Sequence, residues 1–118
     1  MASGVIEKLS NDSANGYCKF PDGTLIQWGT SRITSGSTSV YVSPINLATV
    51  TIQFPISFES TNYLVFGSGR HSTGASIAIA QVGEEKTSCS VHWWDAVART
   101  FSTSAPLVVK WCAIGRWK

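Results

Sequence analysis

Short segments in which apolar and polar residues alternate follow one another along most of the chain, and turn residues separate them. From Gly16 onward such a segment recurs about every ten residues, and no apolar pattern of helical period lasts longer than a turn or two. A length of 118 residues suits one domain. The pattern therefore predicts an all-β fold, an antiparallel β-sandwich, built as a single domain.

The first expected hairpin turns at Pro21-Asp22-Gly23, because Pro presets one turn position and Gly accepts a positive φ. Segment 30–43 is rich in Ser and Thr and is expected to be a surface loop with a short edge strand at 40–42. Gly67-Ser68-Gly69 is expected to break the strand before it. The expected strands are 17–20, 24–28, 49–54, 62–67, 76–82, 87–94, 96–101 and 107–115.

The first fifteen residues differ in character from the rest. They are polar after a short apolar group, Val5, Ile6 and Leu9, whose spacing fits the last turn of a helical stem. We therefore assign residues 1–15 to the remnant of a stem or to an added expression tail. Residues 16–118 are assigned to the β-sandwich.

Charge and cysteine content exclude several classes of partner. The net charge is only +2 and the nine basic residues are scattered, which argues against nucleic-acid binding. No apolar run reaches the length of a membrane span and no signal-peptide core is present, so we expect a soluble chain without membrane insertion. Three Cys without a CxxC pair predict buried, reduced thiols, no disulfide framework, no metal site and no cofactor.

Catalytic groups are poorly supplied. The chain has two His and three Asp, and it has no G-x-S-x-G motif. A catalytic triad would have to combine His92, Asp95 and an unrelated Ser, and the adjacent Glu84 and Glu85 lie in a turn. The prediction is that the protein is not an enzyme.

The segment His92-Trp93-Trp94-Asp95 is the strongest candidate for ligand contact. Neighbours in a strand point to opposite faces, so if Trp93 faces the core, His92 and Trp94 face outward. An exposed Trp flanked by His and Asp suits a sugar, and Arg70-His71 has similar polar capacity. The alternative left open is that both Trp are buried, one of them between subunits. The candidate ligand-binding residues are His92, Trp94, Asp95, Arg70 and His71.

Segment 107–115 is apolar on both faces except at Lys110. A small sandwich covers one face of such a strand, and the other face then packs against another subunit. The same pattern also fits a central strand under a long loop. Trp111 is expected in the core, and Trp117 as a cap or a surface contact.

Three segments, in this order, resemble the C-terminal domain of bacteriophage tail fibres. The opening NGYCKFPDGTLIQWG is similar to the family pattern N-G-Y-x-K-x-x-x-G-x-x-x-Q-W-G, QFPISF to its apolar-Phe-Pro-x-x-Phe segment, and WCAIGRWK to its aromatic-x-A-I-G-x closing strand. The matching residues are Asn15, Gly16, Tyr17, Lys19, Gly23, Gln27, Trp28, Gly29, Phe54, Pro55, Phe58, Trp111, Ala113, Ile114 and Gly115.

This resemblance implies a homotrimeric, non-enzymatic adhesin at the distal end of a tail fibre. The virion, prophage particle or phage-tail-like particle that carries it would be made in the bacterial host cytoplasm, and the ligand would be a host surface glycan or protein. The matching residues belong to the scaffold, so specificity is expected in 30–43, 68–76 and 92–99. The alternatives are a structural trimerisation or capping domain without a ligand, and a stand-alone lectin-like carbohydrate-binding module.

Overall fold

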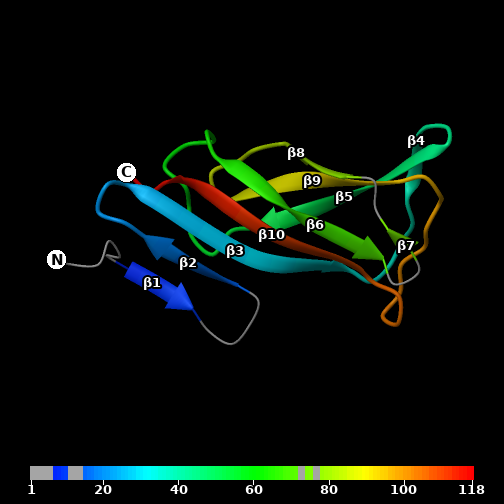
Figure 1. Ribbon diagram of the computed structural model, residues 1–118, viewed down its shortest axis with the longest axis horizontal. Coiled ribbons are helices and arrows are strands. Elements are labelled where there is room, and N and C mark those ends of the chain that lie inside the picture. Colours follow the sequence, from blue (N-terminus) through cyan, green and yellow to red (C-terminus); the bar gives the residue numbers. More distant parts are fainter. Residues whose placement is uncertain (1–6, 11–14, 72–73, 76–77) are drawn as a thin grey trace.

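Two antiparallel sheets face each other in the computed structural model, which describes residues 7–10, 15–71, 74–75 and 78–118 (Figure 1). The described residues contain strands and loops but no helix, and none of them forms a helix that could cross a membrane. The predicted all-β antiparallel sandwich is confirmed. The strands are β1 (Glu7–Ser10), β2 (Gly16–Lys19), β3 (Thr24–Ile33), β4 (Ser39–Val42), β5 (Ile45–Gln53), β6 (Leu64–His71), β7 (Gly74–Ala75), β8 (Ala78–Val82), β9 (Ser88–Asp95) and β10 (Leu107–Arg116).

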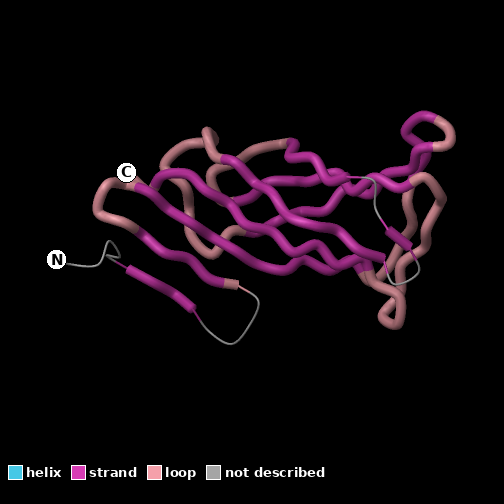
Figure 2. Tube along the Cα trace, in the orientation of Figure 1, coloured by secondary structure: helices cyan, strands magenta, loops and turns pink. Residues whose placement is uncertain are grey.

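One sheet has six strands in the order β1-β2-β3-β10-β6-β7, and the other has four in the order β4-β5-β9-β8. The domain is elongated, 53 × 28 × 20 Å, and its loops collect mainly at the two ends of the long axis (Figure 2). The C-terminus lies at one end, and β4 and β7 lie at the other (Figure 1). The strands thus hold two groups of loops far apart.

The core lies between the sheets and follows the alternation of the sequence. In β5, Val50 and Ile52 are buried and Thr49 and Thr51 are exposed. Trp111 in β10 is buried, as predicted, and Phe54 meets its ring edge-on at 5.7 Å between centroids. The buried apolar residues are Leu25, Ala48, Val50, Ile52, Phe54, Phe58, Tyr63, Val65, Cys89, Val91, Trp93, Phe101, Leu107, Val109, Trp111 and Ala113.

Tyr63 closes the core at the end where β10 finishes. Its hydroxyl donates to the Glu85 carbonyl at 2.6 Å, and burial raises the pKa of Tyr63 to about 12, so the group stays a donor at neutral pH. Of the three thiols, only Cys89 is buried, and Cys18 and Cys112 are half-buried on the outer side of the six-stranded sheet. The prediction of three buried thiols was correct only for Cys89.

The predicted hairpin at 21–23 is confirmed: Gly23 has a φ of 99°, and the Thr24 amide donates to the Asp22 carboxylate at 2.9 Å. Three other predictions of secondary structure were wrong. Residues 7–10 form strand β1, paired with β2, instead of a helical turn, and Val5 and Ile6 of that predicted turn lie outside the described residues. β3 continues to Ile33, because β10 pairs with it along its whole length. Residues 96–101 form a loop, with one isolated bridge between Ser37 and Thr100.

Strand β6 also runs through Gly67 and Gly69 to His71, where the sequence predicted a break. Both glycines lie where other groups approach the strand closely. A Cβ on Gly67 would overlap the backbone carbonyl of Lys110, and one on Gly69 would overlap the indole ring of Trp93. Gly67 makes room for the backbone of the adjacent strand β10, and Gly69 makes room for the buried Trp93 ring; neither glycine ends the strand.

Gln27 joins two of the segments that resemble the tail-fibre family, the opening hairpin and QFPISF. Its side chain is fully buried in β3, where its amide nitrogen donates to the Ile56 carbonyl at 2.9 Å and its oxygen accepts from the Ile56 amide at 3.0 Å. The residue therefore fixes the loop that follows Phe54-Pro55 to the opening hairpin. The N–H and the carbonyl of Ile56 both hydrogen-bond to this one side chain.

We expect Gln27→Ala to lower the free energy of unfolding by about 2–4 kcal/mol, because it leaves a buried N–H and a buried carbonyl without partners. Equilibrium denaturation in urea would measure the loss. Gln53→Ala is the matched control, since Gln53 is exposed and donates a single bond to the Thr87 carbonyl at 3.1 Å. Similar losses of free energy of unfolding in both variants would contradict the role of Gln27 in fixing the loop at Ile56.

Candidate functional site

Strand β9 presents alternate residues to the core and to the surface. Val91 and Trp93 are buried at 1% and 0% exposure, whereas His92 and Trp94 are half-buried on the outer face of the four-stranded sheet. The alternation predicted for this segment is therefore the one observed. Trp93 belongs to the core, and Trp94 belongs to the surface of this chain.

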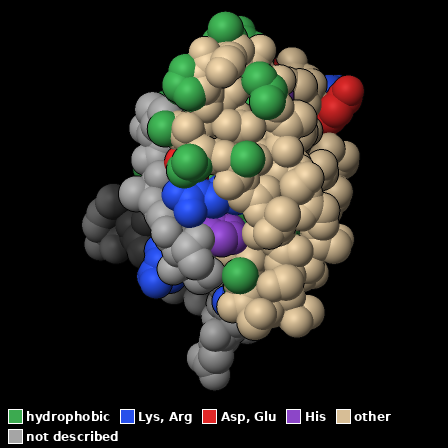
Figure 3. Space-filling view, turned by 90° about the vertical axis from the view of Figure 1, so that its right-hand side faces the viewer, with side chains coloured by type: hydrophobic (Ala, Val, Ile, Leu, Met, Phe, Trp, Pro, Cys, Tyr) green, Lys and Arg blue, Asp and Glu red, His purple; other side chains and the backbone are tan. Residues whose placement is uncertain are grey.

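Trp94 lies beside an exposed tyrosine that the sequence analysis did not single out. The rings of Tyr41 and Trp94 meet edge-on with their centroids 4.7 Å apart, and the His92 ring lies 6.4 Å from that of Trp94. Hydrophobic side chains gather at this end of the molecule, over β4 (Figure 3). We call this region the tip surface; it comprises Val40, Tyr41, Val42, Trp94 and Val97.

Asp95 supports the tip surface from inside. It is buried at 2% exposure, and its carboxylate accepts from the Arg99 guanidinium at 2.8 Å and from the Val97 amide at 3.3 Å. The Arg99 amide in turn donates to the Thr38 hydroxyl at 2.9 Å. Asp95 thus ties the loop after β9 to the segment before β4, and both of its oxygens are engaged within the protein.

Arg70 and His71 point to opposite sides of β6. His71 is buried at 4% exposure, where its Nε2 lies 2.9 Å from the Thr100 carbonyl and its ring lies 5.7 Å from Phe101. Arg70 is exposed on the outer face of the six-stranded sheet. Of the five predicted ligand-binding residues, His92 and Trp94 lie together on one face, Arg70 lies on another sheet, and Asp95 and His71 are internal.

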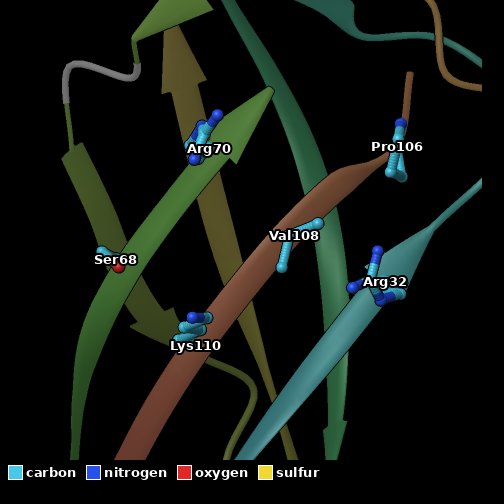
Figure 4. Close-up of a pocket in the computed structure, with 6 residues that line it drawn as sticks. All are labelled: Arg32, Ser68, Arg70, Pro106, Val108 and Lys110. Atoms are coloured by element: carbon cyan, nitrogen blue, oxygen red, sulfur yellow. The ribbon is translucent and has the colours of Figure 1, made fainter. Parts of the chain in front are cut away.

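Arg70 belongs to a hollow of about 470 Å³ on the outer face of the six-stranded sheet (Figure 4). Strand register places Val108 directly opposite both Arg32 and Arg70, and Lys110 follows two residues later on the same face. We call this region the basic hollow; its lining residues are Arg32, Ser68, Arg70, Pro106, Val108 and Lys110.

A second hollow, of about 250 Å³, lies between segment 35–39 and β5, next to the tip surface. Ser35, Ser37 and Ser39 line it, together with Leu47, the cross-strand neighbour of Trp94. Leu47 therefore borders both this hollow and Trp94, and β4, which begins at Ser39, lies at the end of the molecule opposite the C-terminus (Figure 1).

Sequence reasoning missed Tyr41, Arg32 and Lys110 as candidate site residues. The edge strand at 40–42 was predicted, but nothing in the sequence paired it with Trp94. Arg32, Arg70 and Lys110 come from three strands, and they meet only because β10 lies between β3 and β6. Strand order carries this information, and the sequence pattern alone does not.

Residues 19–116 match the family model described as "Putative tail fiber protein gp53-like, C-terminal". The chain belongs to this gp53-like tail-fibre C-terminal family. The family of tail-fibre domains inferred from the three sequence segments is thereby confirmed. No curated protein matches the chain closely enough to count as a relative.

Two solved tail-fibre structures share the fold of this gp53-like domain. An N-truncated R1-type pyocin tail fibre is 19% identical, with a TM-score of 0.55 over 94% of this chain and 87% of the other. An N-truncated R2-type pyocin tail fibre is also 19% identical, with a TM-score of 0.52 over 95% of this chain. The chain spans 39% of that R2-type fibre and therefore matches only one part of it.

Proposed function

We propose that this gp53-like domain is the receptor-binding tip of a phage or pyocin-type tail fibre, where it binds a saccharide on the host bacterial surface. Its membership of the tail-fibre family supports a place in the tail of such a particle. The observation that carries the receptor-binding role is the exposed aromatic tip surface. Single apolar residues on a surface are ordinary, but a contiguous group of them marks an interaction site.

The position of the tip surface fits the end of a fibre. It lies at the opposite end of the 53 Å long axis from the C-terminal end of β10 and the hairpin between β2 and β3 (Figure 1). A shaft attached on the side of β1 and β2 leaves the tip surface free to meet a cell. Because β1 pairs with β2, the sandwich that we propose as the binding part includes residues 7–10 as well as the residues from 16 onward.

A saccharide fits the chemistry of the tip surface better than an extended apolar partner does. Tyr41, at 60% exposure, and Trp94 supply ring surface for the C–H groups of a sugar. His92 lies beside them, and the serine-lined hollow adjoins them with hydroxyl groups that donate and accept. Aromatic and hydroxyl groups side by side match the alternating C–H and O–H groups of a sugar ring.

We also propose that the domain works as a homotrimer that buries the part of the outer face of the six-stranded sheet nearest the C-terminal end of β10 and leaves the basic hollow, at the start of β10, open. Leu64, Phe66 and Ile114 are 61%, 49% and 39% exposed there. Register makes Ile114 the neighbour of both Leu64 and Ile26, and Cys112 the neighbour of both Phe66 and Trp28. We call this region the outer apolar face; its residues are Ile26, Trp28, Leu64, Phe66, Cys112 and Ile114. Such a face is typical of a subunit interface.

Binding without catalysis is part of the proposal. The only triad that the sequence offered needs His92 and Asp95 to meet, but the two side chains lie on opposite faces of β9. The Asp95 carboxylate is bound to Arg99 and to the Val97 amide, so it does not orient an imidazole.

Trp94→Ala tests the tip surface. We expect binding of the labelled domain to its host strain, found by screening a panel of bacterial cells and purified surface glycans, to weaken about tenfold or more, because truncating an aromatic anchor commonly costs over 1 kcal/mol. The fold is expected to persist, since Trp94 is not part of the core. Fluorescence binding titrations and thermal unfolding would measure the two effects.

Trp117→Ala is the matched control, because Trp117 is half-buried at the opposite end, where its indole N–H donates to the Phe20 carbonyl at 2.8 Å. It should retain receptor binding. If Trp94→Ala binds as well as the parent, the tip surface is not the receptor site. If Trp94→Ala unfolds or loses its oligomeric state, Trp94 is structural and the site assignment is wrong.

The second candidate function is a structural trimerisation or capping domain that binds nothing outside the fibre. The outer apolar face is the observation that favours it, because assembly alone accounts for that face. A well-folded trimer that binds no strain and no glycan of the panel would decide for this alternative.

A further inference from the structure

The basic hollow brings three positive side chains together, and none of the described residues that line it is negatively charged. Arg32 and Arg70 flank Val108 on neighbouring strands, and Lys110 lies two residues along β10 on the same face (Figure 4). Like charges on one face of a sheet destabilise it when nothing neutralises them. The arrangement therefore has an energetic cost that no contact within the described chain offsets.

No hydrogen bond or ion pair joins the side chain of Arg32, Arg70 or Lys110 to another described residue, and the residues lining the hollow include no Asp or Glu. Among the described residues, the exposed Glu59 and Glu85 lie toward the other end of β10. There the Glu59 amide donates to the Arg116 carbonyl, and Glu85 lies against Tyr63. Residues 108 and 116 are separated by about 26 Å of extended strand.

The hollow has the parts of an oxyanion site. The two guanidinium groups offer planar pairs of N–H donors, which match the two oxygens of a carboxylate or a phosphate, and Lys110 adds a mobile positive charge. The Ser68 hydroxyl lies on the same face, and Val108 and Pro106 give the hollow an apolar floor. Its volume of about 470 Å³ leaves space for a sugar residue as well as its charged substituent.

We propose that the basic hollow binds an anionic substituent, a phosphate or a carboxylate, of the host surface polysaccharide. This inference rests on the proposed receptor-binding function and names the ligand chemistry of a second contact region, away from the tip surface. The ligand then supplies the negative charge that the described residues lining the hollow lack.

The first experiment measures anion binding directly. The intact chain is titrated with inorganic phosphate, with sodium glucuronate and with neutral glucose at constant ionic strength, and ¹H–¹⁵N spectra report the affected amides. We expect saturable shifts confined to 30–32, 68–70 and 106–110 with at least one of the two anions, and none with glucose. Arg70→Gln should weaken that binding about tenfold, as the loss of one charge-assisted contact predicts.

The matched control is Lys86→Gln, which removes the same charge from an exposed site in the turn between β8 and β9 of the four-stranded sheet. It should leave the affinity for the anion unchanged. Arg70→Lys keeps the charge but loses the planar fork, so an intermediate affinity is expected. The proposal is overturned if neither anion gives saturable shifts, or if Lys86→Gln weakens binding as much as Arg70→Gln.

A second measurement separates this inference from the proposed function. Cell binding of the parent and of Arg70→Gln is compared on host cells whose surface polymer carries phosphate, carries uronate, or carries neither. Weaker binding of the variant on one charged surface identifies the anion, and equal binding of parent and variant on all surfaces overturns the inference while the adhesin role stands. Anion binding in solution without any cell binding would overturn the proposed function instead.

Discussion

Replacing Trp93 by alanine is expected to lower the free energy of unfolding by about 3–5 kcal/mol, the largest effect we expect of a single substitution in this chain. Trp93 is fully buried and its ring fills the space over Gly69, where a Cβ would overlap it. It also meets Phe101 edge-on, with the ring centroids 6.3 Å apart. Removal of the indole leaves a cavity that the strands on either side are too regular to close.

Thermal and urea unfolding at one fixed protein concentration would measure this loss, because assembly makes apparent stability depend on concentration. Trp93→Phe is the informative second variant. The Trp93 indole N–H is buried without a partner among the described residues, so phenylalanine keeps much of the ring and removes an unsatisfied donor. Trp93→Phe should lower the free energy of unfolding by less than half as much as Trp93→Ala does. An alanine variant as stable as Trp94→Ala would refute the assignment of Trp93 to the core.

Phe66→Asp is expected to separate the proposed homotrimer into folded single chains. Phe66 is 49% exposed at the centre of the outer apolar face, opposite Cys112 of β10. Burying three carboxylates in a shared apolar interface costs several kcal/mol per assembly. Because the side chain faces away from the core, the fold itself should persist. Light scattering after size-exclusion chromatography would give the oligomeric state, and circular dichroism would report the fold.

Val97→Asp provides the control for this change, since Val97 is similarly exposed, at 52%, but lies on the tip surface. It should remain trimeric. The interface assignment fails if the parent chain is a single folded chain at micromolar concentration, or if Phe66→Asp assembles as the parent does. It also fails if Val97→Asp separates the subunits equally well.

Local alternation predicted much of the strand structure correctly. The pattern of β5 placed Val50 and Ile52 in the core, and that of β9 divided Trp93 from Trp94. These predictions succeeded because adjacent residues in a strand point to opposite faces, so burial on one side can be read from a few neighbouring positions. Family resemblance added the tail-fibre assignment through three separated segments.

The same local reasoning failed where the outcome depended on residues far along the chain. Gly67 and Gly69 predicted the end of a strand, but they are the positions at which Lys110 and Trp93 approach β6. Asp95 was predicted to bind the ligand because it follows Trp94 directly. In the structure its carboxylate is buried and forms an ion pair with the Arg99 guanidinium. Predicted strand 96–101 is a loop because only Thr100 finds a bridging partner among the described residues.

The sequence by itself determined the all-β class, the family, and the face of the sheet on which most strand residues lie, because these depend on short-range periodicity and on local motifs. Tertiary structure alone decided that Tyr41 meets Trp94, that Gln27 holds Ile56, and that Arg32, Arg70 and Lys110 share one hollow. For the hollow, the physical reason is the strand order β3-β10-β6, which brings together residues separated by up to 78 positions, and the order β4-β5-β9 brings Tyr41 to Trp94 in the same way. Their proximity is fixed by hydrogen bonding between strands, which alternation along a single strand does not encode.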